Sequence, residues 1–346
     1  MSTPTEFTTG ADDRGLDEQG LDEQGLDEQG LDEEAALILV TAIRDAATAH
    51  SGAELDRALD AIGWVDALDV ARGVAVPGLF DQQGRTGTTS GALGRLLRHT
   101  LGLPVESPAL ALLPAFGSAE PPMSDDGLRG LATADIAAAD QVAVLMLDGA
   151  SVQWGAAPTS SLERRVVGGL DPRLGLVEVT AGSPIEADGW APTAGSWDEA
   201  VAICRLAVGH EIVGAMRTML ELARSHALDR VQFDRPIAGF QAVRHRLAEA
   251  LVAVEAAEAA LGGAWDDGSP LAAALAKVVC GESARTVRRH TQQVLAGIGF
   301  TDEHDLHLYV RRTIVLDGLF GDARTLASEI GAGVLARGDL PRLLPL

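Results

Sequence analysis

The sequence is short of several features that mark whole classes of protein. Its 346 residues include two cysteines, Cys204 and Cys280, and both lie in apolar surroundings of helical pattern. They predict buried, reduced thiols and exclude a disulfide framework. No apolar run reaches the length of a membrane-spanning helix, and no basic stretch followed by an apolar one opens the chain. These absences predict a cytoplasmic protein that does not contact a membrane.

Positive charge is also scarce, since Lys277 is the single lysine and the formal net charge is −23. Much of the negative charge comes from residues 15–34, where the unit Gly-Leu-Asp-Glu-Gln recurs and ends as Gly-Leu-Asp-Glu-Glu. This period fits neither a helix nor a strand, and the recurring Gly lowers helix propensity. We therefore predict a disordered acidic tail over 1–34. Because the rest of the chain is acidic too, we expect no nucleic-acid partner.

Beyond the tail, most of the chain has the periodicity of amphipathic helices, with apolar residues recurring at three and four positions. Two helices are predicted before the middle of the chain and four longer ones near its end. Short linkers between the four predict an antiparallel bundle. One of them starts with Ser269-Pro270, a capping residue followed by proline at the first helical position. The predicted helices cover 34–49, 53–62, 196–227, 241–261, 269–296 and 303–330.

The middle of the chain differs in pattern. Residues 142–147 and 176–180 are short apolar runs with β-branched residues, bounded by Gly, Pro or Asp, and they predict a few strands. Residues 78–95 are rich in Gly and Thr, but no Gly-Lys-Ser/Thr follows, so we predict a connection between helices and no phosphate loop. The predicted fold is mainly α with a small β region: an N-terminal helical domain (35–110), a reduced β domain (111–195) and a C-terminal four-helix bundle (196–346).

Two motifs lie near the ends of the bundle helices. The first reads Arg230-x-Gln232-Phe233, with Gln241 further on. Arg can pair with a pyrophosphate oxygen through its planar fork, Gln offers both a donor and an acceptor, and Phe offers a stacking face. Taken alone, the motif also fits a loop with an exposed Arg and a core Phe.

The second motif is Gln293-Val-Leu-Ala296-Gly297-x-Gly299-Phe300, which closes the third helix of the bundle. Small residues at such a place permit a close approach between the backbone and a ligand. The same pattern also fits a Gly-rich end of a helix.

Together the two motifs resemble the acyl-CoA dehydrogenase family, and most of all the actinobacterial members that act on CoA thioesters in steroid degradation. The resemblance is strong over 196–325 and weak over 35–195. It implies FAD as the cofactor, an acyl-CoA substrate and an acceptor of the electron-transfer flavoprotein type. In the family, these motifs reach across a dimer interface to the FAD of the neighbouring subunit. The resemblance thus assigns cofactor binding to Arg230, Gln232, Phe233, Gln241, Gln293, Ala296 and Gly297, with Ala296 where the family usually has Gly.

The catalytic base of the family is missing from both of its usual places. The family reaction removes a weakly acidic α-proton, which requires a carboxylate, and passes the β-hydride to the flavin. Family members place that Glu about twenty residues after the second motif, here Phe320, or just before an Arg in the first bundle helix, here Cys204. Asp317, Asp322 and Glu211 lie near these positions and are the alternative bases.

A second feature of the family is also missing. Its flavin-ring motif, a Thr-Glu-Pro-Gly-like turn, corresponds here to residues 111–127, which lack the matching polar residues. The chain therefore resembles the non-catalytic subunit of an α2β2 heterotetramer, in which a second acyl-CoA dehydrogenase subunit brings the base. A homotetramer with a relocated base and a flavin-free scaffold remain alternatives. His304 and His307 would need a third ligand and an open geometry to bind a metal, and the similar stretch in the family is structural, so we expect no metal site.

Overall fold

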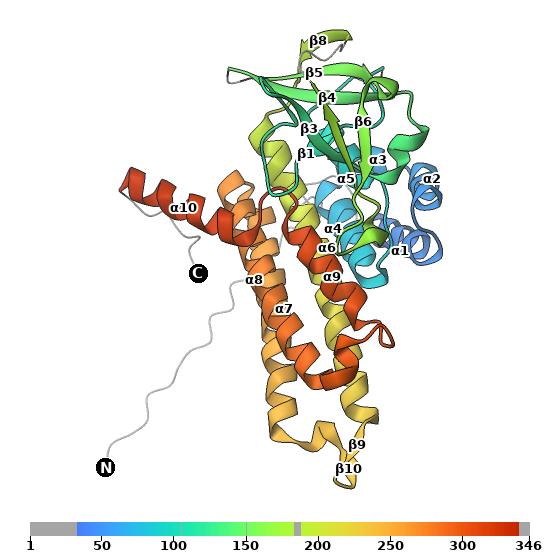
Figure 1. Ribbon diagram of the computed structural model, residues 1–346, viewed down its shortest axis with the longest axis vertical. Coiled ribbons are helices and arrows are strands. Elements are labelled where there is room, and N and C mark those ends of the chain that lie inside the picture. The colour runs from blue at the N-terminus through green and yellow to red at the C-terminus, as the bar shows by residue number, and fades with distance from the viewer. Residues whose placement is uncertain (1–32, 105, 150, 183–187, 339–346) are drawn as a thin grey trace, which may run out of the picture.

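The computed structural model describes residues 33–338, except 105, 150 and 183–187. A twisted sheet lies at one end of the molecule, and long helices extend from it to the other end (Figure 1). The predicted disordered tail lies outside the described residues, apart from its last two, which begin the first helix. No helix of the described part is both long and apolar enough to cross a membrane.

The N-terminal helices are fastened to the bundle by a close crossing between α4 and α6. A Cβ atom on Gly84 would lie 2.1 Å from the Glu211 carbonyl oxygen, and one on Gly214 would lie 2.0 Å from that of Asp81. Only glycine permits this approach. The helices predicted over 34–49 and 53–62 are confirmed. The connection predicted over 78–95 is shorter in the structure, where it covers 87–91, because helices occupy the residues on both sides. The helices are α1 (Glu33–Ala49), α2 (Ala53–Ile62), α3 (Trp64–Val70), α4 (Arg72–Thr86) and α5 (Ala92–Thr100).

The β region contains more strands than predicted. Its eight-stranded sheet has the order β6-β7-β3-β2-β4-β5-β8, with β1 paired to β3. The runs at 142–147 and 176–180 fall in β4 and β7, as predicted, but strands of two residues are too short to show an alternating pattern. The strands are β1 (Leu113–Pro114), β2 (Met123–Ser124), β3 (Gly127–Ala132), β4 (Gln141–Asp148), β5 (Ser151–Pro158), β6 (Glu163–Val166), β7 (Val177–Ala181) and β8 (Asp188–Pro192).

The C-terminal helices form the bundle, with three long helices as predicted: α6 (Trp197–Asp229), α7 (Gln241–Asp267) and α8 (Pro270–Leu295). Ser269 caps α8, because its hydroxyl accepts a hydrogen bond from the Ala272 amide. The mainly α fold with a sheet region is confirmed. The exact division into domains stays a prediction.

The fourth bundle helix, predicted over 303–330, is wrong as a single helix. It is divided into α9 (Leu306–Asp317) and α10 (Ala323–Arg337), which points away from α9 in Figure 1. The break occurs because Phe320 and Gly321 both have positive φ, at 57° and 93°, which no right-handed helix accommodates. The new turn, 318–322, contains Phe320, which the resemblance predicts to lie at the family's base position.

Candidate functional site

The first motif forms a hairpin at the end of the bundle away from the sheet (Figure 1). Strand β9 (Val231–Gln232) pairs with β10 (Arg235–Pro236) around a two-residue turn. Phe233 and Asp234 in that turn have φ of 55° and 62°. Such a turn favours Asn and Gly, and a bulky Phe at positive φ is strained. The Phe233 side chain is nonetheless 85% exposed, so this chain gains no burial in return. Strain without burial is typical of a residue selected for contact with another molecule.

The hairpin is held in place by the start of α7. The guanidinium of Arg235 lies 4.1 Å from the centre of the Phe240 ring, and Phe233 meets the same ring edge to face at 6.0 Å between centroids. These contacts hold the tip in place within the chain. Gln241 follows directly as the first residue of α7.

Arg230 caps the C-terminal end of α6 and has an exposed side chain. Among the residues that the structure describes, no carboxylate forms an ion pair with it. The pKa of the nearby His226 imidazole is lowered mainly by burial, and the positive charges of His304 and Arg230 lower it further. Arg230 is therefore free to pair with an anion from outside the chain.

The second motif lies at the same end of the bundle. The rings of His226 in α6 and His304, just after the motif, are 6.4 Å apart. Ala296 ends α8 with φ 53° and ψ −132°, a conformation that normally requires Gly. This agrees with the Gly that the family has there. The strain costs on the order of 1–3 kcal/mol.

The two glycines of the motif differ in their surroundings. A Cβ atom on Gly297 would meet nothing within 4 Å, so the space beside it is open to another molecule. A Cβ atom on Gly299 would lie 2.9 Å from the Leu295 Cβ. Gly299 is therefore needed for packing within the chain. Together, all seven predicted cofactor residues are exposed at one end of the bundle: Arg230, Gln232, Phe233, Gln241, Gln293, Ala296 and Gly297.

The turn at the family's base position holds an apolar side chain, because Phe320 is 1% exposed. Two cations hold this turn. Lys277 donates to the carbonyl oxygens of Asp317 and Gly321 at 2.7 and 3.3 Å, and Arg205 donates to that of Phe320 at 3.0 Å. Sequence reasoning missed Lys277, although a single lysine within an apolar helix was a visible signal.

The second base position, Cys204, is fully buried, and this burial raises the pKa of its thiol far above the ordinary value. It is therefore a neutral thiol. The carboxylates proposed as alternatives all have structural partners. Asp317 lies 3.5 Å from the Lys277 ammonium, and Asp322 caps α10 by accepting from the Arg324 and Thr325 amides.

Glu211 belongs to a buried junction between three parts of the fold. Arg312 of α9 donates to Glu211 of α6 at 2.9 Å and also pairs with Asp171, next to the sheet. The same guanidinium donates to the Thr88 carbonyl at 3.1 Å and the Gly87 carbonyl at 3.2 Å, between α4 and α5. Burial raises the pKa of Glu211, and Arg312 opposes that shift. Sequence reasoning missed Arg312, since its partners lie more than 100 positions away.

Residues 111–127, which lack the family's flavin-ring motif, cover the turn that holds Phe320. The Gly117 amide donates to the Gly318 carbonyl at 2.9 Å, and a Cβ on Gly318 would lie 2.2 Å from the Phe116 ring. Trp197 of α6 donates to the Ala119 carbonyl at 2.8 Å and so holds the covering segment. An aromatic ring thus packs against the turn that contains Phe320, the predicted base position.

The two histidines of the second motif region make local contacts. His304 Nδ1 accepts from the Leu306 amide at 3.1 Å, and His307 Nδ1 lies 2.9 Å from the His304 carbonyl oxygen. No group of three His, Cys, Asp or Glu side chains in the described part of the chain could hold a metal ion.

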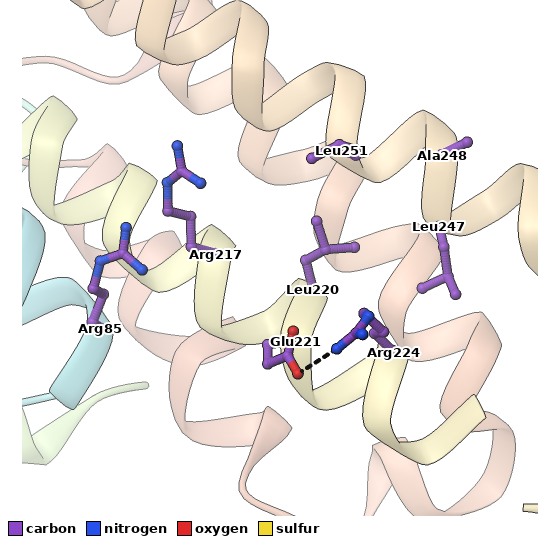
Figure 2. Close-up of a pocket in the computed structure, with 8 residues that line it drawn as sticks. All are labelled: Arg85, Arg217, Leu220, Glu221, Arg224, Leu247, Ala248 and Leu251. Atoms are coloured by element: carbon purple, nitrogen blue, oxygen red, sulfur yellow. Dashed lines mark hydrogen bonds and ion pairs between the residues drawn. The ribbon is translucent and has the colours of Figure 1, made fainter. Parts of the chain in front are cut away.

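A groove of about 490 Å³ lies between α6, α7 and the end of α4. Figure 2 shows Leu220 and Leu247 facing it, with arginines at its margin. Each arginine has a carboxylate partner: Arg85 with Asp81, Arg217 with Glu258, and Arg224 with Glu221. The groove therefore offers no unbalanced charge to a ligand, and it contains none of the predicted site residues.

Comparison with known proteins supports the predicted family. Residues 196–335 match the family model of the acyl-CoA dehydrogenase C-terminal domain. Acyl-CoA dehydrogenase IpdE2 from Mycobacterium tuberculosis is 40% identical over 102 residues, which are 30% of this chain and 32% of that protein. The match thus spans about a third of the length of this curated relative.

Solved structures show the fold over most of the chain. A variant of the Tcur3481-Tcur3483 steroid ACAD has a TM-score of 0.71 at 21% identity, covering 88% of this chain and 98% of its own. The ChsE4-ChsE5 complex from Mycobacterium tuberculosis has a TM-score of 0.67 at 17% identity, and the match covers 90% of this chain and 99% of that one. A glutaryl-CoA dehydrogenase from Mycobacterium smegmatis in complex with FADH2 has a TM-score of 0.67 at 14% identity, with 90% and 97% covered.

Proposed function

We propose that this chain, whose residues 196–335 form an acyl-CoA dehydrogenase C-terminal domain, is the non-catalytic subunit of a heteromeric acyl-CoA dehydrogenase. The assembly would be an α2β2 heterotetramer that introduces a double bond between the α and β carbons of a CoA thioester. A second acyl-CoA dehydrogenase subunit would supply the catalytic Glu. FAD would accept the hydride, and a protein of the electron-transfer flavoprotein type would reoxidise it.

One contrast within the chain carries this proposal. The residues assigned to the cofactor are all exposed, and the charge of Arg230 is unpaired within the described part of the chain. The base position, by comparison, is a buried Phe320 in a turn covered by Phe116. These features fit a chain that contributes exposed residues to a neighbour's cofactor and has a buried apolar side chain where its own base would lie.

The chemistry of the exposed residues fits FAD. Arg230 would pair with a pyrophosphate oxygen, since a guanidinium offers two parallel donors to such a group. The side-chain amides of Gln232, Gln241 and Gln293 would supply donors and acceptors to the sugar or adenine edges. Phe233 would offer a ring face, and Gly297 leaves room for the cofactor to approach the backbone.

The substrate is the least constrained part of the proposal. We propose a CoA thioester of steroid origin, because the Tcur3481-Tcur3483 steroid ACAD shares the fold of this chain. The curated relative adds an acyl-CoA dehydrogenase at 40% identity over the matched region.

The experiment is co-expression of this chain with the neighbouring open reading frame, followed by flavin quantitation after denaturation. We expect the chain alone to be insoluble or poor in flavin, and the complex to carry one flavin per heterodimer. Two flavins per heterodimer, or turnover by the isolated chain, would show that this chain completes a site of its own. A complex that assembles without flavin would indicate a scaffold.

A further inference from the structure

A second cavity, of about 350 Å³, lies between the sheet and α9. Pockets for small molecules commonly lie at such junctions, and their volumes are about 300–1,000 Å³. Its walls are mostly apolar, with Leu131 from β3, Val315 from α9 and Phe116 from the covering segment. Leu170 and Leu176, which precede β7 in the chain, also line the cavity. A compact hydrocarbon group would therefore lose its contact with water here.

The polar rim of this cavity consists of Arg129, Arg165 and Glu178, and the register of the strands brings these residues together. Leu131 of β3 pairs with Glu178 of β7, and Glu178 pairs with Arg165 of β6. Directly paired residues lie on the same face of an antiparallel sheet, and so does Arg129, two positions before Leu131. One face of three strands thus carries Leu131 beside Glu178 and the two arginines.

The charge of the rim is unbalanced. Arg129 and Arg165 both donate to the one carboxylate of Glu178, at 3.3 and 3.0 Å. Their side chains are 74% and 75% exposed, so further N–H groups remain available. Hydrogen bonding from Arg165 lowers the pKa of Glu178, which therefore stays ionised and leaves a net charge of one positive unit. The groove of Figure 2 differs in this respect, because each of its arginines has its own carboxylate.

We propose that this cavity binds a small monocarboxylate with a compact or medium-length hydrocarbon body. The carboxylate would take bidentate hydrogen bonds from Arg129 and Arg165, and the hydrocarbon would lie against Leu131, Leu176 and Val315. This site belongs to the sheet end of the molecule, and it is independent of the FAD residues at the far end of the bundle (Figure 1).

Isothermal titration calorimetry on the co-expressed complex tests the proposal, with decanoate as the probe and 1-decanol as its uncharged counterpart. Decanoate should bind at one site per copy of this chain and more tightly than decanol. Arg165→Gln should weaken decanoate binding by at least about tenfold, because one charge-assisted pair is lost. The matched control is Arg164→Gln, since Arg164 is exposed on the same strand but lies outside the cavity lining.

A second pair of variants tests the cavity itself. Gly169 lines the cavity, and a Cβ there would meet only the Val167 side chain at 4.0 Å, so Gly169→Phe should fill the space without disturbing the fold. Its neighbour Gly168 has nothing within 4 Å and does not line the cavity, so Gly168→Phe is the control. Decanoate binding should be lost in the first variant and kept in the second.

Three results would overturn the proposal: equal binding of decanol and decanoate, unchanged binding in both Arg165→Gln and Gly169→Phe, or stoichiometric displacement of decanoate by FMN. Flavin content is measured in the same samples. A flavin content that stays the same in Gly169→Phe separates this site from the FAD site, so each proposal can fail without the other.

Discussion

Replacing Lys277 by Met should release the turn that holds Phe320. The lysine is 0% exposed, and its ammonium donates to two carbonyl oxygens and lies 3.5 Å from the Asp317 carboxylate. Breaking a buried pair by removing one partner costs about 3–5 kcal/mol, because the remaining charge is left uncompensated. We expect about 3 kcal/mol, the low end of that range, since the Asp317 side chain keeps 20% exposure.

The assay is urea unfolding of the purified complex, followed by circular dichroism at fixed protein concentration. With a denaturant slope of about 3 kcal/mol/M, the midpoint should fall by about 1 M. Arg285→Met is the matched control, since Arg285 is also a paired cation on α8 but is 58% exposed. Its loss should cost less than about 1 kcal/mol. Equal midpoints in the two variants would refute the assignment of Lys277 as the residue that holds the turn.

The pH dependence gives a second check on Lys277. Burial lowers its pKa below the ordinary 10.5, although Asp317 opposes the shift. Between the lowered pKa and 10.5, the unfolded chain binds one proton more than the folded chain at this site. The free energy of unfolding should therefore rise with pH in this window. That rise should be absent from Lys277→Met, and its persistence there would assign it to another group.

Three further outcomes are expected. Asp317→Asn and Asp322→Asn should leave turnover of the complex within a few-fold, whereas loss of a true general base costs about 10²- to 10⁴-fold; loss of turnover with flavin retained would place the base in this chain. Arg230→Ala should weaken FAD retention by about ten- to a hundredfold, measured by flavin release on dilution. The control is Arg224→Ala, which removes an exposed arginine paired with a neighbouring Glu. Equal retention in the two variants would contradict the cross-interface role. Deletion of residues 1–33 should leave assembly and activity nearly unchanged, since the repeat has no apolar periodicity to bury; a large loss of turnover would reveal a role for the tail.

Local signals in the sequence were enough to predict much of the fold. Periodicity placed α6, α7 and α8, and Ser269-Pro270 marked the start of α8, because a cap and a helical proline act within one turn. The same periodicity ran through 318–322 and hid the break, which depends on two positive φ angles and on the Asp322 cap. The family motifs predicted a set of cofactor residues, and the fold gathers these residues, all exposed, at one end of the bundle. Their cofactor roles remain predictions.

What the sequence could not give are contacts between distant segments. The junction of Arg312 with Asp171 joins residues 141 positions apart, and no local pattern marks either partner. The contact between Phe116 and Gly318 likewise depends on how the segment over 111–127 returns to the bundle. Such contacts form only after the helices and the sheet have packed together, so they are properties of the whole chain.

The exposed hairpin tip also affects how the cell must handle this protein. Phe233 is 85% exposed and Val231 54%, and Phe300 beside the second motif is 72% exposed. A newly made chain therefore presents apolar side chains to solvent, where they can be captured by chaperones or by other unfolded chains. In the proposed heterotetramer, copies without a partner subunit would be removed or would aggregate, so its two genes should be translated in matched amounts.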